Sequence, residues 1–278
     1  MPTKIIHFTT TGTRKFIVPL GVEKHLLDWG ISADKIVIKK LLVKILFYYI
    51  ILYNMTRQKQ FTRKNKATSN KATYYKPIDY SYLLGKIKGI DDNLMKIHFK
   101  LYEGLVDATN GALKYIQSHD VSDMVKYSAI QKEFSLFFNG MRLHELYFGV
   151  MCGENMDKMD PELLKDINKY FGSFDKWKKN FIKTGMIPGV GFAVLCRDKT
   201  NGLLFNTWIN EFNIGEIIGA DPLLVMDMWE HAYISEFGLD LNKYTNTFLN
   251  NVNWSVVSTL YNDSVNGVKS TGLFSKHL

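Results

Sequence analysis

Apolar side chains recur at three- and four-residue intervals over the middle of the chain, which is the pattern of amphipathic helices. The first stretch begins after Asp91 or Asp92, either of which can cap a helix. The second runs from about Met124 to Met151. The apolar positions are Leu94, Ile97, Leu101, Leu105, Ala108 and Ala112 in the first stretch and Ile130, Phe134, Phe137, Met141 and Phe148 in the second. Together the two stretches predict an α-helical hairpin domain over residues 76–153.

The pattern changes after residue 154, where two helices precede three short apolar runs. Asp160 before Pro161 is a helix start, and Ser173 caps a second helix that ends near Gly185. The apolar runs are Phe192–Cys196, Leu203–Phe212 and Leu223–Asp227, and a turn at Asp198–Gly202 separates the first two. These runs predict a three-stranded antiparallel sheet whose strands are joined in sequence as a meander.

One more helix is predicted from Leu241 to Val252, and no element is assigned after Tyr261. The predicted fold class is therefore α+β, because an N-terminal α-helical hairpin is followed by an α+β domain with a three-stranded antiparallel sheet. The second domain covers residues 154–278.

Two histidines lie on or beside the apolar faces of the long helices. His98 lies beside the stripe of the first helix. His144 falls on the stripe of the second, one turn after Gly140, where two backbones could approach closely. Burying an imidazole is costly unless it has a hydrogen-bond partner or a metal. Each histidine is therefore either a satisfied core residue or part of a metal site between two helices.

The stretch Asp227–Tyr233 combines a carboxylate and an imidazole behind an apolar strand. Asp227 ends the predicted strand, and His231 follows four residues later, about one helical turn. The two side chains can therefore converge on one point, which suits a metal site or an acid–base pair. A buried Asp–His hydrogen bond in the core is the alternative interpretation.

The heptapeptide Asp-Met-Trp-Glu-His-Ala-Tyr at 227–233 resembles the signature of the iron/manganese superoxide dismutases. Shorter similarities accompany it in the family's order across residues 76–261. They are Asn139–Phe148, Gly189–Phe192, Val252–Trp254, and His98 with Leu101–Gly104 and Asn110. The resemblance implies one Fe or Mn ion per subunit, with one coordination position left open. The metal ligands that it implies are His98, His144, Asp227 and His231.

The resemblance also implies a reaction and a partner. The substrate is superoxide, which is disproportionated to oxygen and hydrogen peroxide. Trp229 is expected to form an apolar wall together with Phe192, and Glu230 is expected to bond His231 of a second subunit in a homodimer. Three imidazoles and one carboxylate suit both Fe and Mn, so the ligand set does not choose between them.

Three positions depart from the pattern of the family. Leu105 stands where the family has a Tyr at the substrate gate. The family's Gln or His that bonds the metal-bound solvent comes from one of two positions, which hold Gly140 and Phe212 here. These changes predict weaker dismutation with the metal present. They also leave an alternative function open, a catalytically weak protein of this fold with a structural or assembly role, for example in a ribosome-like particle.

Charge divides the chain into a basic extension and a slightly acidic body. Residues 1–75 hold 14 Lys and Arg against 3 Asp and Glu, a net charge of +11. Residues 76–278 hold 21 against 24, a net charge of −3, so the body shows no sign of nucleic-acid binding. The apolar fraction of 46% indicates a globular chain, and two cysteines are too few for a disulfide framework.

The basic extension supports several interpretations. Its longest uninterrupted apolar run, Ile45–Tyr53, is far shorter than the ~20 residues that span a bilayer. Residues 56–73 are polar and basic, as in a disordered linker. The extension is expected to be disordered, to carry a targeting signal, or to contact an anionic surface, whereas a start at Met55 would place 54 residues outside the protein. Cytoplasmic and mitochondrial locations both stay open.

Overall fold

The computed structural model describes residues 3–8, 14–19, 74–118, 122–152 and 159–268. The chain divides into two compact units, Met1–Phe61 and Thr62–Leu278. In the first unit, strands β1 (Thr3–Phe8) and β2 (Arg14–Pro19) form an antiparallel two-stranded sheet that the sequence pattern did not indicate. The apolar run at 45–53 and the linker at 56–73 lie outside the described residues. Among the helices that are described, none is both long enough and apolar enough to cross a membrane.

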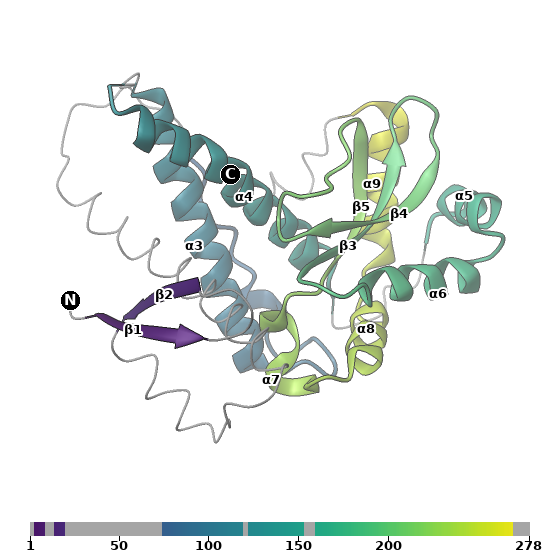
Figure 1. Cartoon of the computed structure of the whole chain (residues 1–278). Coiled ribbons are helices and arrows are strands. Elements are labelled where there is room, and N and C mark those ends of the chain that lie inside the picture. The colour runs from purple at the N-terminus through teal and green to yellow at the C-terminus, as the bar shows by residue number, and fades with distance from the viewer. Residues whose placement is uncertain (1–2, 9–13, 20–73, 119–121, 153–158, 269–278) are drawn as a thin grey trace. The chain divides into compact units, whose positions relative to one another are not determined.

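The second unit begins with the predicted helical hairpin (Figure 1). A 3-10 turn, η1 (Ser81–Leu83), precedes the long helices α3 (Asp92–Gln117) and α4 (Met124–Gly149), which pack against each other. The side chain of Asp91 accepts a hydrogen bond from the backbone N–H of Asn93, so Asp91 is the N-cap of α3. Asp123 caps α4 in the same way.

The buried face of α3 differs from the predicted stripe at one position. Ile97 was expected in the core, but it is 57% exposed. His98 and Tyr102 are 1% exposed, so the centre of the buried face runs through these two residues. Each residue turns an α-helix by about 100°, which carries Ile97 away from that line. The predicted stripe contains only aliphatic residues and omits His98 and Tyr102. It therefore places the buried face too close to Ile97.

The two halves of α4 are buried to different degrees. Ile130, Phe134 and Phe137 are only half-buried, whereas nearly every residue of Gly140–Phe148 is buried. The C-terminal half is more deeply buried because α4 packs against β5 as well as against α3. The histidine of α4 lies in this buried half.

The α+β domain follows, as predicted. Its helices and strands are α5 (Pro161–Phe171), α6 (Phe174–Gly185), β3 (Gly191–Asp198), β4 (Leu204–Asn210), β5 (Ala220–Asp227), η2 (Glu230–Ala232), α7 (Ile234–Phe237), α8 (Leu241–Asn250) and α9 (Trp254–Asn266). Asp160 and Ser173 cap α5 and α6, and Gly172 ends α5 in the left-handed conformation that favours glycine. The predicted fold class is confirmed.

The strand order of the sheet is β4-β3-β5, so the predicted meander is wrong. Both pairings are antiparallel, and β3 lies in the middle. The segment between Asn210 and Ala220 therefore carries the chain from one edge of the sheet to the other. The six residues Gly191–Cys196 are all buried, as expected of a central strand. Short apolar runs identify strands but contain no information about their spatial order.

Helix α9 was not predicted. Its sequence is rich in Ser, Thr, Val and Asn, which are weak helix formers, so local propensity gave little signal. Asn253 caps the helix by accepting hydrogen bonds from the N–H groups of Ser255 and Val256. Packing stabilises the helix: α9 contacts β5, Val257 is buried, and Trp254 packs edge-on against Phe174 and Trp177 of α6.

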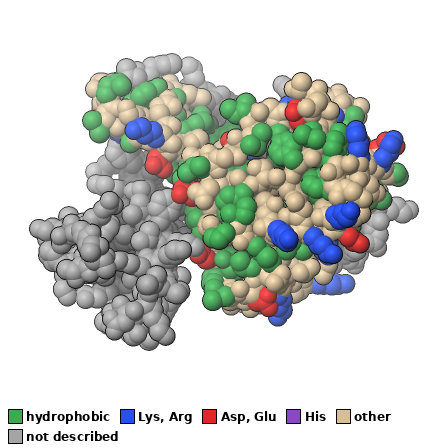
Figure 2. All heavy atoms as spheres, turned by 45° about the vertical axis from the view of Figure 1, so that its right-hand side comes forward, with side chains coloured by type: hydrophobic (Ala, Val, Ile, Leu, Met, Phe, Trp, Pro, Cys, Tyr) green, Lys and Arg blue, Asp and Glu red, His purple; other side chains and the backbone are tan. Residues whose placement is uncertain are grey.

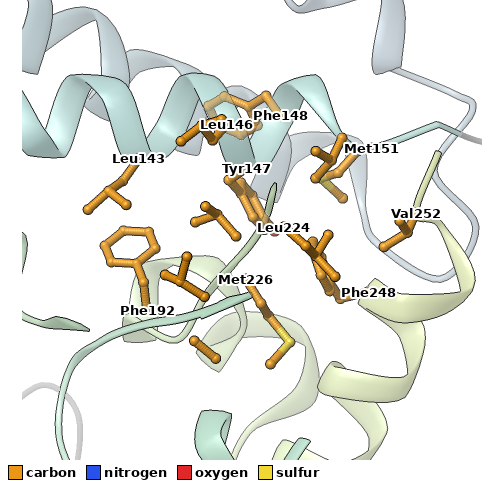
Figure 3. Packing of buried hydrophobic residues seen from close by; sticks show 14 of the residues in the cluster. Leu143, Leu146, Tyr147, Phe148, Met151, Phe192, Leu224, Met226, Phe248 and Val252 are labelled. Atoms are coloured by element: carbon orange, nitrogen blue, oxygen red, sulfur yellow. The ribbon is translucent and has the colours of Figure 1, made fainter. Parts of the chain in front are cut away.

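The core lies where α4, the sheet and α8 meet. Figure 3 shows Tyr147 of α4 near Leu224 of β5 and Phe248 of α8, and Leu143 of α4 near Phe192 of β3. Figure 2 shows one face of the molecule, on which charged and apolar side chains of the described residues are interspersed. His98 and His144 are 1% and 0% exposed, so their imidazoles belong to the interior.

Candidate metal centre

Four side chains from separate elements converge on one point in the interior. His98 comes from α3, His144 from α4, Asp227 from the end of β5, and His231 from η2. One nitrogen or carboxylate oxygen from each lies within 4.8 Å of the others. Asp227 Oδ2 is 3.2 Å from Nε2 of both His98 and His231, and 3.6 Å from Nε2 of His144. In the described part of the chain, this is the one group of three or more such donors.

The backbone turn after β5 brings Asp227 and His231 together. Asp227 is the last residue of β5 and pairs with Phe192 of β3. The N–H of Trp229 donates to Asp227 Oδ1 at 2.8 Å, which bends the chain into η2. His231 then lies over the carboxylate that began the turn. The sequence prediction that these two side chains converge is confirmed.

A backbone carbonyl sets the tautomer of His144. Its Nδ1 lies 2.6 Å from the carbonyl oxygen of Gly140, one turn earlier on α4. A carbonyl only accepts hydrogen bonds, so Nδ1 carries the proton and Nε2 presents a lone pair. Nε2 is buried without a hydrogen-bond partner. An unsatisfied buried acceptor is costly, and a metal ion among these four donors would satisfy it. The residues therefore fit Fe or Mn.

The protonation states of the group also suit a metal. Burial lowers the pKa of His98 to about 4 and that of His144 to about 3, so both imidazoles are neutral near pH 7. Burial would raise the pKa of Asp227, but electrostatic interaction with His231 and hydrogen bonds with His231 and His98 outweigh it and hold that pKa below its usual range. Neutral imidazole and ionised carboxylate are the forms that bind metals.

Aromatic rings enclose one side of the cluster. Phe192 lies 5.9 Å from His144, between ring centres. The indole of Trp229 stacks against His231 at 5.8 Å, and Phe212 also stacks on Trp229. Trp229 and Phe192 are therefore placed as the predicted apolar wall requires. Such a wall keeps bulk water from the donor atoms and strengthens their electrostatic interactions.

Glu230 lies next to the cluster but outside it. It begins η2 and is half-buried in this chain. Its predicted contact is with a histidine of a second subunit, so a single chain neither contains nor tests that contact. The role of Glu230 stays a prediction.

The three positions that depart from the family pattern meet at one place. A Cβ atom added to Gly140 would lie 3.2 Å from both methyl carbons of Leu105 and 3.2 Å from Cδ1 of Phe212. Phe212 is also 5.8 Å from the ring of His144. The space beside His144 is thus filled by two apolar side chains, and all three of these positions lack a hydrogen-bonding side chain.

Sequence reasoning missed two tyrosines beside the cluster. Tyr147 follows His144 by three residues on α4, and its hydroxyl contacts that of Tyr244 on α8. The position of Tyr147 one turn after a candidate ligand was an available signal. Nothing in the pattern pointed to Tyr244, which reaches the site only through the packing of α8.

Comparison with known proteins agrees with this geometry. A family model described as iron/manganese superoxide dismutases, C-terminal domain, matches residues 159–260. A superoxide dismutase [Fe] of Pyrobaculum aerophilum is 30% identical over 183 residues, which are 64% of this chain and 87% of the relative. A superoxide dismutase [Fe] of Methanothermobacter marburgensis is 31% identical over 182 residues, 63% of this chain and 89% of the relative.

A superoxide dismutase [Mn/Fe] of Aeropyrum pernix is 27% identical over 197 residues, which are 69% of this chain and 92% of the relative. These matches cover most of each relative, so the similarity is not confined to the heptapeptide. By sequence, by fold and by the meeting of its four donor side chains, the chain belongs to the iron/manganese superoxide dismutase family.

Proposed function

We propose that this protein is a superoxide dismutase that works at one Fe or Mn ion held by His98, His144, Asp227 and His231. The observation that carries the proposal is the buried, unpartnered Nε2 of His144, which lies in a cluster of four donors. A scaffold would gain nothing from an unsatisfied imidazole nitrogen in its core. The names of the relatives include iron alone and manganese or iron, and the donor set suits either metal.

In the proposed reaction, one superoxide anion gives up an electron and leaves as oxygen. A second superoxide takes up that electron together with two protons and leaves as hydrogen peroxide. When bound, Fe or Mn supplies this one-electron chemistry by alternating between its trivalent and divalent states.

The residues of the chain prepare the site for that exchange. The Asp227 carboxylate supplies the one negative charge among the four donors and balances part of the charge of a cation. The Gly140 carbonyl orients the His144 imidazole with Nε2 toward the cluster. Trp229 and Phe192 shield one side from water.

The apolar contact of Leu105, Gly140 and Phe212 is expected to lower the rate of dismutation. Phe212 and Leu105 offer no group that could donate a hydrogen bond to, or accept one from, a solvent molecule beside His144. Polar groups around a metal commonly change its affinity or activity roughly 10–100-fold. We therefore expect metal binding with slow dismutation.

The active form is proposed to be a homodimer joined through the region of Glu230 and His231. Glu230 lies on the short turn η2, next to a candidate ligand, and is half-buried in the single chain. Ile97 and Ile234 are 57% and 37% exposed, on α3 and α7, and both elements contact η2. A second subunit would cover such apolar surface.

Metal analysis combined with a dismutation assay tests the proposed function. Purified protein is loaded with Fe or Mn, its metal content is measured, and superoxide consumption is compared with that of the His144→Ala variant. The proposal requires about one metal ion per chain and consumption above that of the variant. Full metal content without dismutation would favour the structural or assembly role, and absence of metal binding would refute the site.

A further inference from the structure

Two buried tyrosine hydroxyls are linked by hydrogen bonds to the backbone carbonyl of Asp227. Tyr147 and Tyr244 are 1% and 0% exposed. The hydroxyl of Tyr244 donates to the backbone carbonyl oxygen of Asp227 at 2.7 Å. The hydroxyls of Tyr147 and Tyr244 are 3.2 Å apart. Neither tyrosine is one of the four donors or part of the aromatic wall.

The direction of this hydrogen-bonded chain follows from its end. The carbonyl oxygen of Asp227 can only accept, so the single proton of the Tyr244 hydroxyl is committed to it. Tyr244 must therefore accept in its contact with Tyr147, and Tyr147 must donate. The chain runs from Tyr147 to Tyr244 to Asp227. Linked hydrogen bonds of this kind strengthen one another in a medium of low dielectric constant.

Asp227 is held on two sides, which leaves one oxygen to face the histidines. The N–H of Trp229 holds Oδ1, and Tyr244 holds the backbone carbonyl. The remaining carboxylate oxygen, Oδ2, is the atom that lies near His98, His144 and His231. Asp227 is the last residue of β5 and pairs with Phe192 of β3, and the Tyr244 hydroxyl adds a hydrogen bond from α8 to its backbone carbonyl.

Tyr147 connects this chain to the helices that carry two other donors. It lies on α4, three residues after His144, and its ring is 5.2 Å from that of His98 on α3. It also stacks on Phe248 of α8, with ring centres 5.5 Å apart and planes 9° apart. A displacement of Tyr147 would therefore change its packing against α3 and α8 as well as the position of α4.

We infer that Tyr244, and Tyr147 through it, are positioning residues that hold the Asp227 carboxylate against the three imidazoles. The inference rests on the proposed function and adds to it two residues that act on the metal without touching it. It assigns Tyr244 the larger effect, because only its hydroxyl contacts Asp227. Tyr147 acts by orienting that hydroxyl.

Removing the two hydroxyls one at a time tests the inference. Tyr244→Phe, Tyr147→Phe and the double variant keep the rings and their packing. Metal affinity is measured by competition with a chelator well below the thermal transition, together with the EPR spectrum of the Fe(III)-loaded proteins. Tyr244→Phe is expected to lower affinity about 10-fold and to change the spectrum. Tyr147→Phe is expected to have a smaller effect, and the double variant to match Tyr244→Phe.

Tyr261→Phe is the matched control. Its hydroxyl also makes a 2.7 Å hydrogen bond, but to Asp166 Oδ2 on α5, far along the chain from the four donors. This variant is expected to lose some thermal stability and to keep the affinity and spectrum of the wild type. The comparison separates loss of a buried hydroxyl from loss of positioning.

Several results would overturn the inference. Wild-type affinity and spectrum in Tyr244→Phe would show that the hydroxyl does not position Asp227. Full additivity in the double variant would show that Tyr147 does not act through Tyr244. If Tyr244→Phe fails to fold, Tyr147→Phe decides, and an unchanged spectrum there would refute the chain. A wild-type protein that binds neither Fe nor Mn would instead refute the proposed function.

Discussion

The ring of Phe212 stacks on the indole of Trp229, with ring centres 4.7 Å apart and planes 15° apart. Phe212 is 3% exposed, and its ring fills the space that a side chain at Gly140 would occupy. It therefore occupies a place from which a polar side chain could reach the donors of the metal centre. The Phe212 ring packs against Trp229 and offers no hydrogen-bonding group beside His144.

Phe212→Gln or Phe212→His is predicted to raise the dismutation rate of the metal-loaded protein. Each variant restores a hydrogen-bonding group beside the site, and an effect of roughly 10–100-fold is typical of such groups. Leu105→Tyr is expected to add to the gain, because it supplies a second, separate polar group. The rate of superoxide consumption per bound metal is the measurement.

Phe181→Gln is the control for this prediction. Phe181 is a fully buried ring on α6 that stacks on Trp177, so the change inserts the same amide elsewhere in the core. It is expected to destabilise the fold without raising the rate. If the wild type is already fast, or if the Phe212 variants only lose activity and stability, then another group supplies the hydrogen bond, and Glu211 and Asn213 become the candidates.

Gly140→Gln is predicted to behave differently from Phe212→Gln. The new side chain would start 3.2 Å from Leu105 and Phe212, so these neighbours must move. Overpacking of this kind costs about 1–3 kcal/mol. Adding Phe212→Ala makes room, so part of the loss should be recovered. A double-mutant cycle on the free energy of unfolding measures the coupling, and simple additivity of the two changes would show that the positions do not compete for space.

His144→Ala and Asp227→Ala are each predicted to abolish stoichiometric Fe or Mn binding. The four donors act on one ion, and removing one leaves too few ligands for a stable site. Metal content after dialysis is the measurement. Asp166→Ala is the control, because it removes a carboxylate that binds Tyr261 rather than the cluster. Full metal occupancy in either ligand variant would contradict the assignment.

Much of this architecture was readable in the sequence because local chemistry determines it. Asp160 and Ser173 mark helix starts by accepting hydrogen bonds from backbone N–H groups a few residues on, and Pro161 fits the first position of α5. The aliphatic stripe nearly located the buried face of α3 and failed at Ile97, where His98 and Tyr102 turn that face. Strand order and α9 escaped prediction since both depend on packing between distant segments.

The candidate site divides in the same way. Asp227 and His231 are close in sequence, so their convergence follows from one turn. The contact of Gly140 with Leu105 and Phe212 required the structure, because it joins three distant parts of the chain. The hydrogen bond from the Tyr244 hydroxyl to Asp227 also required the structure, because it joins α8 to the end of β5.

Glu230→Ala is predicted to weaken the homodimer and the retention of metal together. In the proposed dimer, its carboxylate bonds a metal-binding histidine of the second subunit, so both properties depend on one contact. Sedimentation and metal content measure the two effects. Glu236→Ala is the control on the neighbouring α7, because the Glu236 carboxylate accepts from the backbone N–H of Asp91 in the same chain. A wild-type protein that sediments as a monomer at micromolar concentration would contradict the dimer.

The position at which the basic extension ends can be tested by two truncations. The backbone N–H and C=O of Tyr75 both bond the side chain of Asn110, at 2.9 and 2.8 Å. The Tyr75 ring packs edge-on against Phe138. Tyr75 is thus attached to both long helices, although the charge pattern placed it in the extension. Residues before Tyr74 are predicted to be dispensable for folding and for metal binding.

A chain that starts at Tyr74 should therefore keep the metal content and thermal transition of the full protein. A chain that starts at Lys76 should keep the metal but melt lower, because it loses two hydrogen bonds and a ring contact. Each hydrogen bond contributes about 0.5–1.5 kcal/mol, and about 1 kcal/mol shifts Tm by roughly 2–4 °C in a body of this size. Asn110→Ala in the chain from Tyr74 should lower Tm similarly, since it removes the same bonds from the other side. If the chain from Tyr74 loses metal or stability, the extension contributes to the folded body, and the boundary lies nearer the N-terminus.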